Sequence, residues 1–183
     1  MLNYIWVIIM QKGLVQIYTG SGKGKTTASM GLGFRAVGCG MSVKVVQFLK
    51  TSETGELTSC EMFGDKFNIY RFGTVRGFYN TMTDEQKLIT HEEVRTAFEF
   101  AKKLANECDL LILDEIFGAI SNELITEDEL CNFINSKPAN VELVLTGRNA
   151  PKSVISLADY VSEINAIKHP FEKGVSSRRG IEY

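Results

Sequence analysis

The sequence predicts a three-layer α/β fold built around a mainly parallel β-sheet. Short, almost continuously apolar segments, such as 43–49 and 110–113, alternate with amphipathic segments of helical length. A strand that helices cover on both faces has this apolar pattern, and its alternation with helices is typical of a parallel sheet. The chain has 183 residues without an internal repeat or a low-complexity linker, so a single domain over 1–183 is expected.

In the first half of the chain, glycine-containing segments separate several of the expected helices and strands. The expected elements are, in order, a strand at 14–18, a helix at 25–37, a strand at 43–49, a loop with a short helix at 51–66, a strand at 67–72 and a turn-rich loop at 73–82. The first helix is expected to end at Gly38 and Gly40, because glycine is favoured just beyond helix C-termini.

The second half opens with a long amphipathic helix. Thr83 and Gln86 have the spacing of a capping box at its start. Its buried side is expected to hold five apolar residues, namely Leu88, Val94, Phe98, Ala101 and Leu104. Four further elements are expected after the strand at 110–113: a helix at 126–136, a strand at 141–145, a helix at 151–158 and a short strand at 160–164.

Composition and charge exclude several classes of protein. Hydrophobic residues make up 44% of the chain, and Lys+Arg 20 against Asp+Glu 22 gives a net charge of −2. No general attraction to nucleic acid or to a membrane surface is therefore expected. Four cysteines are widely spaced, with no C-x-x-C pair for zinc or thiol exchange, which indicates a reducing cytoplasm.

Residues 1–12 form an N-terminal extension before the first expected strand. The stretch 1–9 is apolar, but it is much shorter than the roughly 20 residues of a membrane helix. It also lacks the basic region and cleavage site of a signal peptide. Two interpretations remain open: an extra strand, or residues upstream of a true start at Met10.

The loop TGSGKGKT at 19–26 joins the first strand to the first helix. This is the setting of a P-loop, in which backbone amides and a helix N-terminus surround phosphate. Lys25 would then contact the phosphates and Thr26 would bind Mg²⁺. The strict motif has glycine at position 19, so Gly20 and Gly22 are expected to permit the turn. The alternative is a surface turn with solvated lysines.

Charged residues follow two other strands at the same expected edge of the sheet. Asp114 and Glu115 end the apolar segment 110–113, where open α/β sheets bind ligands. Asp114 is expected to orient Mg²⁺ and Glu115 to reach metal or ligand, unless Asp114 only caps a helix. Arg148 follows the strand at 141–145, as a bidentate phosphate ligand or as a simple surface residue.

Several segments together resemble the P-loop corrinoid adenosyltransferases. The resemblance runs from about residue 13 to 183 and is most specific in the loop G-x-G-K-G-K-T-T and in the ending K-H-P-F…G…G-I-E-Y. This family transfers the 5′-deoxyadenosyl group of ATP to the cobalt of a reduced, Co(I) corrinoid and releases triphosphate, in adenosylcobalamin synthesis or salvage. The resemblance implies a three-layer P-loop NTPase fold of the RecA-like type, with ATP, Mg²⁺ and a corrinoid as ligands.

The resemblance also implies the site residues. The expected catalytic residues are Lys25, Thr26, Glu115 and Arg148, and the expected metal ligands are Thr26, Asp114 and Glu115. The expected nucleotide- and corrinoid-binding residues are Gly20, Ser21, Gly22, Lys23, Gly24, Lys25, Thr26, Thr27, Arg35 and Phe72. The family often has a G-F-T-W segment that helps to remove the lower cobalt ligand. Segment 71–79 has no tryptophan here, so Phe72, Phe78 or Tyr79 is expected to supply the apolar wedge.

The expected partners are ATP, a corrinoid and a flavoprotein or other reductase that supplies the electron, within a homodimer and without nucleic acid or membrane. Reduced cobalt is itself a strong nucleophile, so a chain with only two histidines suits this chemistry. The identity of the corrinoid stays open. Two other functions also stay open: a P-loop ATPase or kinase acting at the γ-phosphate, and a non-catalytic nucleotide-binding partner protein.

Overall fold

The computed structural model describes residues 12–75 and 77–183 and contains a six-stranded sheet in the order β3-β2-β4-β5-β1-β6. Its strands are β1 (Val15–Thr19), β2 (Val43–Gln47), β3 (Phe67–Arg71), β4 (Leu110–Asp114), β5 (Glu142–Thr146) and β6 (Tyr160–Glu163). Each neighbouring pair is parallel, so the carboxyl ends of all these strands lie at one edge. The predicted α/β fold with a mainly parallel sheet is confirmed.

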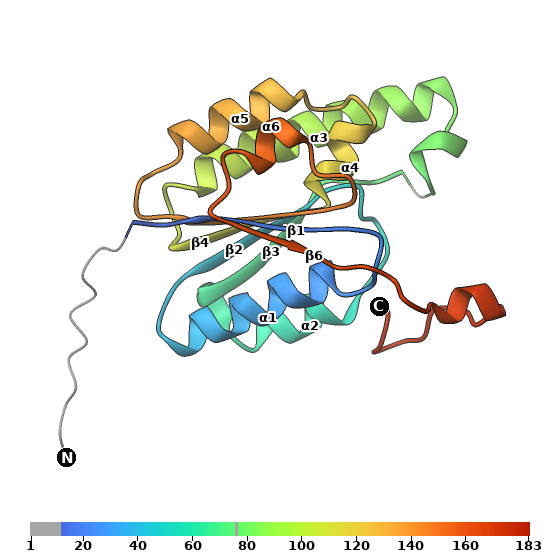
Figure 1. Ribbon diagram of the computed structural model, residues 1–183, viewed down its shortest axis with the longest axis horizontal. Helices are drawn as coiled ribbons and strands as arrows, with labels where there is room; N and C mark the ends of the chain where they lie inside the picture. Colours follow the sequence, from blue (N-terminus) through green and yellow to red (C-terminus); the bar gives the residue numbers. More distant parts are fainter. Residues whose placement is uncertain (1–11, 76) are drawn as a thin grey trace, which may run out of the picture.

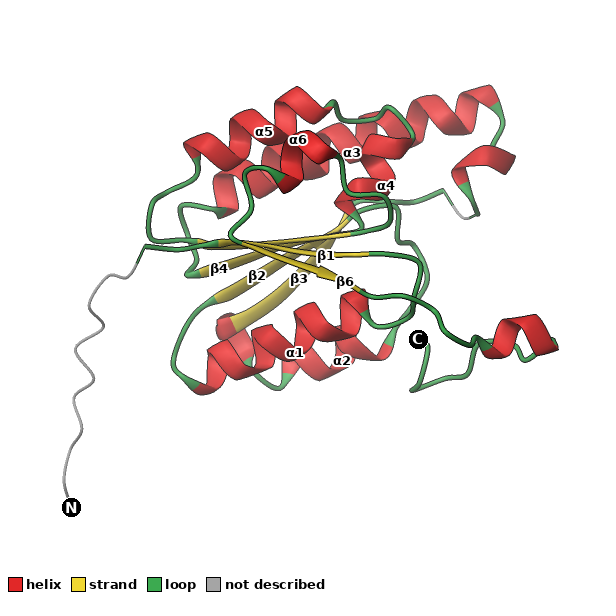
Figure 2. Cartoon of the chain, viewed as in Figure 1, coloured by secondary structure: helices red, strands yellow, loops and turns green. Residues whose placement is uncertain are grey.

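Helices cover both faces of the sheet and give the predicted three layers (Figure 1). The α-helices are α1 (Lys25–Gly38), α2 (Gly55–Glu61), α3 (Asp84–Leu104), α4 (Ile116–Ser121), α5 (Glu127–Ser136) and α6 (Lys152–Ile155). Three short 3₁₀ turns are η1 (Gly64–Lys66), η2 (Tyr79–Thr81) and η3 (Pro170–Lys173). Helices α1 and α2 lie on one face, and α3 to α6 lie on the other (Figure 2).

The core consists of two apolar clusters, one on each face of the sheet. Strand β4 shows why both form: Leu111 and Leu113 belong to the cluster beneath α3 to α6, whereas Leu110 and Ile112 belong to the cluster on the α1 side. Successive side chains of a strand point to opposite faces, so a strand covered on both faces must be apolar throughout. The continuous apolar pattern of β4 therefore has the predicted cause.

Three local predictions need correction. Leu88 is 70% exposed, whereas the other four residues assigned to the apolar side of α3 are buried. Helix α3 has 21 residues and spans about 31 Å, so its first turns extend beyond the five-residue strands that the helix covers. Helix α4 was not predicted, because six residues are too few to show a helical period. The helix expected at 151–158 is only Lys152–Ile155.

The long helix α3 begins as the sequence predicts. The Thr83 hydroxyl oxygen accepts a hydrogen bond from the Gln86 backbone N–H at 3.3 Å, and the Gln86 side chain accepts one from the Thr83 N–H at 2.9 Å. This capping box fixes where the loop 73–82 ends.

The stretch 1–9, for which an extra strand was one expectation, lies outside the described residues. Over 12–75 and 77–183, the helices are all too short or too polar to cross a membrane. All four cysteines are free.

Candidate nucleotide and substrate site

The glycine-rich loop lies between the end of β1 and the start of α1, as predicted. Gly20 has φ 100°, and a Cβ there would lie 2.4 Å from the Ile164 carbonyl oxygen. The Gly22 N–H donates a hydrogen bond of 2.7 Å to the same carbonyl. Residues just after β6 therefore pack against the outside of the loop so closely that only glycine fits. Gly20 and Gly22 permit the turn that the motif requires, even though Thr19 replaces its first glycine.

The inner side of the loop carries positive charge and hydrogen-bond donors that suit an anion. Lys25 is buried, and its Nζ donates hydrogen bonds of 2.8 Å to the carbonyl oxygens of Gly20 and Gly22. Burial lowers the pKa of Lys25, while the nearby Glu115 carboxylate acts against that shift. Helix α1 has no acidic residue in its first turn and no side-chain cap. Its N-terminal N–H groups and positive dipole are thus available to phosphate oxygens.

Asp114 is the most constrained polar residue of the site. It is 1% exposed, and its Oδ1 accepts hydrogen bonds from the hydroxyls of Thr26 at 2.8 Å and Thr146 at 2.7 Å. Its Oδ2 accepts one from Gln47 Nε2 at 2.9 Å. Helix α4 has Glu115 at its N-cap position, so the alternative that Asp114 caps this helix is wrong.

The contact between Thr26 and Asp114 also tests whether the site suits Mg²⁺. A hydroxyl and a carboxylate are hard oxygen donors, and Mg²⁺ typically takes only one or two protein ligands beside water and phosphate. The two groups lie together at the first turn of α1, where phosphate oxygens would also arrive. The donor set fits the ion.

Glu115 has a strained backbone beside these groups. Its φ is 61°, in the left-handed region, and its N–H donates a 2.9 Å hydrogen bond to Thr146 Oγ1. Burial and, next, the charge of Asp114 raise the pKa of the Glu115 carboxyl, while Lys25 is the leading group that counteracts them. Non-glycine residues in this region cluster at functional sites. Glu115 lines the same cavity as Lys25 and Thr26, just after the end of β4.

Arg148 follows β5 at the same edge. The preceding Gly147 has φ 144°, and a Cβ there would lie 2.7 Å from Phe117 Cβ. This close packing of the turn against α4 directs the chain outward, and Arg148 is exposed. It nevertheless lines the same cavity as Lys25, as a phosphate ligand must.

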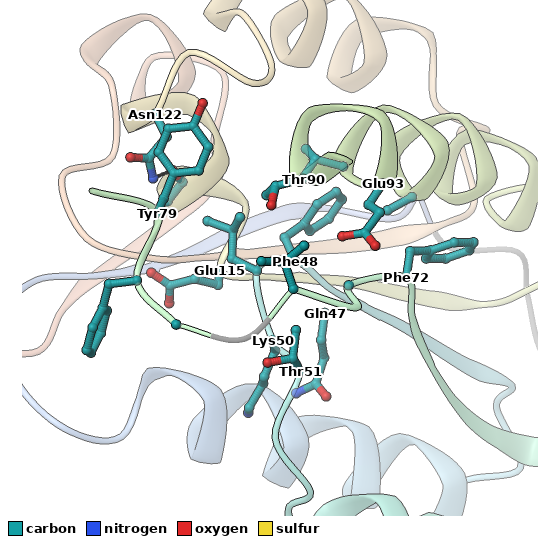
Figure 3. A pocket seen from close by; sticks show the side chains of 18 of the residues that line it. Gln47, Phe48, Lys50, Thr51, Phe72, Tyr79, Thr90, Glu93, Glu115 and Asn122 are labelled. Carbon is teal, nitrogen blue, oxygen red and sulfur yellow. Dashed lines mark hydrogen bonds between the residues drawn. The ribbon is translucent and has the colours of Figure 1, made fainter. Parts of the chain in front are cut away.

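Two cavities adjoin these residues. A larger one, of about 1140 Å³, is lined by the glycine-rich loop, Arg148 and residues 180–183. A smaller one, of about 440 Å³, is lined by Phe48, Phe72 and Tyr79 among others (Figure 3). Seven residues line both cavities, namely Thr26, Lys50, Phe78, Asn80, Glu115, Gly118 and Asn122. The larger cavity therefore adjoins a more apolar one.

Most of the predicted site residues meet at this edge of the sheet. Those from Ser21 to Thr27 line the larger cavity, and Phe72 lines the smaller one, with its ring centroid 5.3 Å from that of Phe100. Gly20 belongs to the same loop without lining either cavity, whereas Arg35 lies away from the site. It lies ten residues into α1, about 15 Å along the helix axis from the loop, and neither cavity includes it.

Three residues outside the predicted set also line the site. Gln47 is the last residue of β2, Lys50 follows three residues later, and Asn122 follows α4. Gln47 and Lys50 had a detectable signal, because they follow an apolar strand that ends at the ligand-binding edge. Asn122 had none, since α4 itself was not predicted.

The segment after β6 closes the outer side of the larger cavity. Glu182 Oε1 lies 3.5 Å from Lys23 Nζ, and Arg178 donates to the same carboxylate. The imidazole of His169 lines this cavity, and its Nδ1 accepts a hydrogen bond from the Phe171 N–H at 3.2 Å. The K-H-P-F…G-I-E-Y ending thus reaches the nucleotide site.

Fold and site define a P-loop nucleotide-binding protein with a second, apolar cavity beside the phosphate loop. A KaiC-like protein from Pyrococcus horikoshii has the same fold, with a TM-score of 0.52 and 17% identity over 86% of this chain and 75% of that one. The family model for the ATP:corrinoid adenosyltransferases BtuR/CobO/CobP matches residues 11–183, and the chain belongs to this family.

Curated relatives agree with the family model. A corrinoid adenosyltransferase of Sinorhizobium sp. is 39% identical over 178 residues, which cover 94% of this chain and 81% of the relative. That of Escherichia coli is 34% identical over 176 residues, which cover 94% and 87%. The corrinoid adenosyltransferase CobA of Salmonella typhimurium is 32% identical over 176 residues, which also cover 94% of this chain and 87% of the relative. The resemblance stated from the sequence is confirmed.

Proposed function

We propose that this chain transfers the 5′-deoxyadenosyl group of ATP to the cobalt of a Co(I) corrinoid and releases triphosphate, in adenosylcobalamin synthesis or salvage. The observation that carries the proposal is the meeting of the phosphate-binding cavity with the apolar cavity at Thr26 and Glu115, in a chain of this family. A triphosphate in the loop and a cobalt nucleophile in the neighbouring cavity would share this border.

The triphosphate is held by the loop amides, the N-terminus of α1 and Lys25. Lys25 Nζ donates to two carbonyl oxygens of its own loop, which hold the ammonium on the inner side of that loop. Phosphate oxygens bound there would be within its reach. Arg148 contributes a second cation from the end of β5. Both charges stabilise triphosphate as it leaves.

Mg²⁺ is proposed to be held by Thr26 and Asp114, with Glu115 near it. When bound, it would neutralise part of the triphosphate charge. Asp114 is oriented for this by Thr146 and Gln47, whose hydrogen bonds fix both of its carboxylate oxygens. Burial raises the pKa of Glu115, and a bound cation would oppose that shift.

The corrinoid is proposed to approach from the apolar cavity. Its wall includes Phe72, Tyr79 and the exposed Phe78 of the loop 73–82. Aromatic side chains here would keep water from the lower face of the cobalt and help to remove its lower ligand. The protein's contribution is to bring cobalt and C5′ together in a dry site, because the nucleophile needs no side-chain base.

The proposal also includes the remaining expectations from the resemblance. These are a homodimer, a flavoprotein or other reductase as electron donor, a cytoplasmic location and one functional domain preceded by the extension 1–12.

The test mixes the protein with chemically reduced corrinoid, ATP and Mg²⁺ and follows the conversion of the Co(I) spectrum to that of the alkylated form. Lys25→Ala should abolish conversion, and triphosphate should appear in equal amount to the alkylcorrinoid. Release of ADP and phosphate would instead support the ATPase or kinase alternative. Nucleotide binding without any alkylated product would support a non-catalytic partner protein.

A further inference from the structure

Lys50 supplies a cation at the border between the two cavities. It is the positively charged member of the residues that line both of them. Figure 3 shows Lys50 and Glu115 on the lining of the same pocket, one from the end of β2 and the other from the end of β4. These strands are adjacent in the sheet, so the two side chains reach the border from neighbouring positions.

The backbone before Lys50 is strained. Leu49 has φ 53°, so β2 and β4 are each followed by a non-glycine residue in the left-handed region. A Cβ added to Gly118 would lie 3.3 Å from Leu49 Cδ1, which shows how closely Leu49 packs over α4. This conformation turns the chain so that Lys50 follows at the border. Strain of this kind persists at sites where a side chain must be held in a particular place.

Charged neighbours fix the ammonium group. Lys50 Nζ donates a 2.9 Å hydrogen bond to Glu56 Oε1 and lies 3.9 Å from Asp114 Oδ2. Glu56 Oε1 also lies 3.7 Å from the Arg71 guanidinium. Burial raises the pKa of Glu56, but the hydrogen bond from Lys50 is the leading cause that lowers it to about 2. The Glu56 carboxylate therefore stays charged beside Lys50, whose side chain is only 26% exposed.

We infer that Lys50 is a further catalytic residue, whose ammonium binds the triphosphate oxygen that leaves C5′. The inference rests on the proposed function. In that reaction the electron pair of Co(I) forms the Co–C5′ bond, and cobalt becomes formally Co(III). The C5′–O bond breaks, and its electron pair stays on the triphosphate oxygen. New negative charge therefore develops where triphosphate meets the corrinoid cavity, and a fixed cation there stabilises the transition state.

The rival role for Lys50 is purely structural, as the ion-pair partner of Glu56 between β2 and α2. The two roles differ in what they predict. A structural lysine affects folding and the binding of both substrates. A leaving-group cation affects kcat and the binding of free triphosphate, and leaves the binding of adenosine unchanged.

The experiment compares Lys50→Met and Lys50→Arg with Lys44→Met, a control at a lysine of β2 itself, the strand that Lys50 follows. Lys44 lines neither cavity, and its Nζ donates to the Asp65 carbonyl oxygen at 3.3 Å. Alkylcorrinoid formation from Co(I) corrinoid, ATP and Mg²⁺ gives kcat and both KM values. Inorganic tripolyphosphate and adenosine serve as separate inhibitors. Circular dichroism checks the fold, and Lys50→Gln replaces Lys50→Met if the latter does not fold.

Lys50→Met is expected to lower kcat by about 10²- to 10³-fold, the usual effect of removing one such donor. It should also weaken inhibition by tripolyphosphate about tenfold or more, while inhibition by adenosine stays unchanged, and Lys50→Arg should keep most of the activity. The inference is overturned if a folded Lys50→Met keeps kcat within about threefold of the unaltered protein, or if tripolyphosphate inhibits it equally well. Failure of the unaltered protein to form alkylcorrinoid would instead overturn the proposed function.

Discussion

Replacing Asp114 with asparagine should destabilise the protein without ligands. The Asp114 carboxylate accepts hydrogen bonds from three donors, and an asparagine side chain has only one oxygen to accept them. Two are the hydroxyls of Thr26 and Thr146, and the third is the Nε2 amide of Gln47. An asparagine that still accepts from both hydroxyls turns its NH₂ group toward the Gln47 amide, so that two donors meet. Gln47 cannot turn to relieve this, because its Oε1 accepts a 2.7 Å hydrogen bond from Arg71 Nε.

The size of the effect follows from the bond that is lost. A hydrogen bond to a charged, buried group contributes about 1.5–3 kcal/mol, so Asp114→Asn should lower the free energy of unfolding by about 2 kcal/mol. Urea denaturation followed by circular dichroism measures this value. In a Gln47→Met background the opposing donor is absent, and the cost of Asp114→Asn should fall by about 1 kcal/mol. A loss below about 0.5 kcal/mol, or the same loss in both backgrounds, would refute this account of the site.

Two further predictions concern the pH dependence of stability and the packing of α1. Burial raises the pKa of Glu115 in the folded protein, so the protonated side chain favours the folded state. This contribution to stability is complete when the pH is below the ordinary pKa of glutamate, and it is lost as the pH rises through the raised pKa. Glu115→Gln should therefore raise the melting temperature of the ligand-free protein at pH 8 more than at pH 4, as measured by calorimetry, and an equal shift at both would contradict the prediction. Gly31→Ala, where an added Cβ meets nothing within 4 Å, should stabilise α1 by about 0.5–1 kcal/mol in urea denaturation. Gly33→Ala should destabilise it, because its Cβ would lie 2.7 Å from the Phe67 ring, and the same sign for both would contradict the packing described.

The parts of the fold that a local pattern specifies could be predicted from the sequence. Strand β4 was recognisable because both of its faces are buried, and the Thr83 cap because its chemistry is local. The long helix α3 could be predicted, but the exposure of Leu88 on it could not. Burial there depends on where the sheet ends, and that is a property of the packed structure.

The residues of the site also divide into those that a local motif specifies and those that only the packed structure brings together. Lys25 and Asp114 belong to motifs in which spacing along the chain reflects spacing in the structure. Lys50 and Gln47 have no motif, and their importance appears only when β2 is seen beside β4. Arg35 is the opposite case: its assignment comes from the resemblance alone, and α1 places it away from the loop, so it stays a prediction.

In the proposed reaction the phosphate loop presents C5′ of ATP, and not its γ-phosphorus, to the nucleophile. The most direct measurement uses ATP labelled with ¹⁸O in the bridge between C5′ and the α-phosphorus, together with Co(I) corrinoid and Mg²⁺. Mass spectrometry of the products should find all of the label in released triphosphate, because the C5′–O bond breaks. If the label instead remains in ADP, and the phosphate is unlabelled, the nucleophile attacked the γ-phosphorus and this orientation of ATP is wrong.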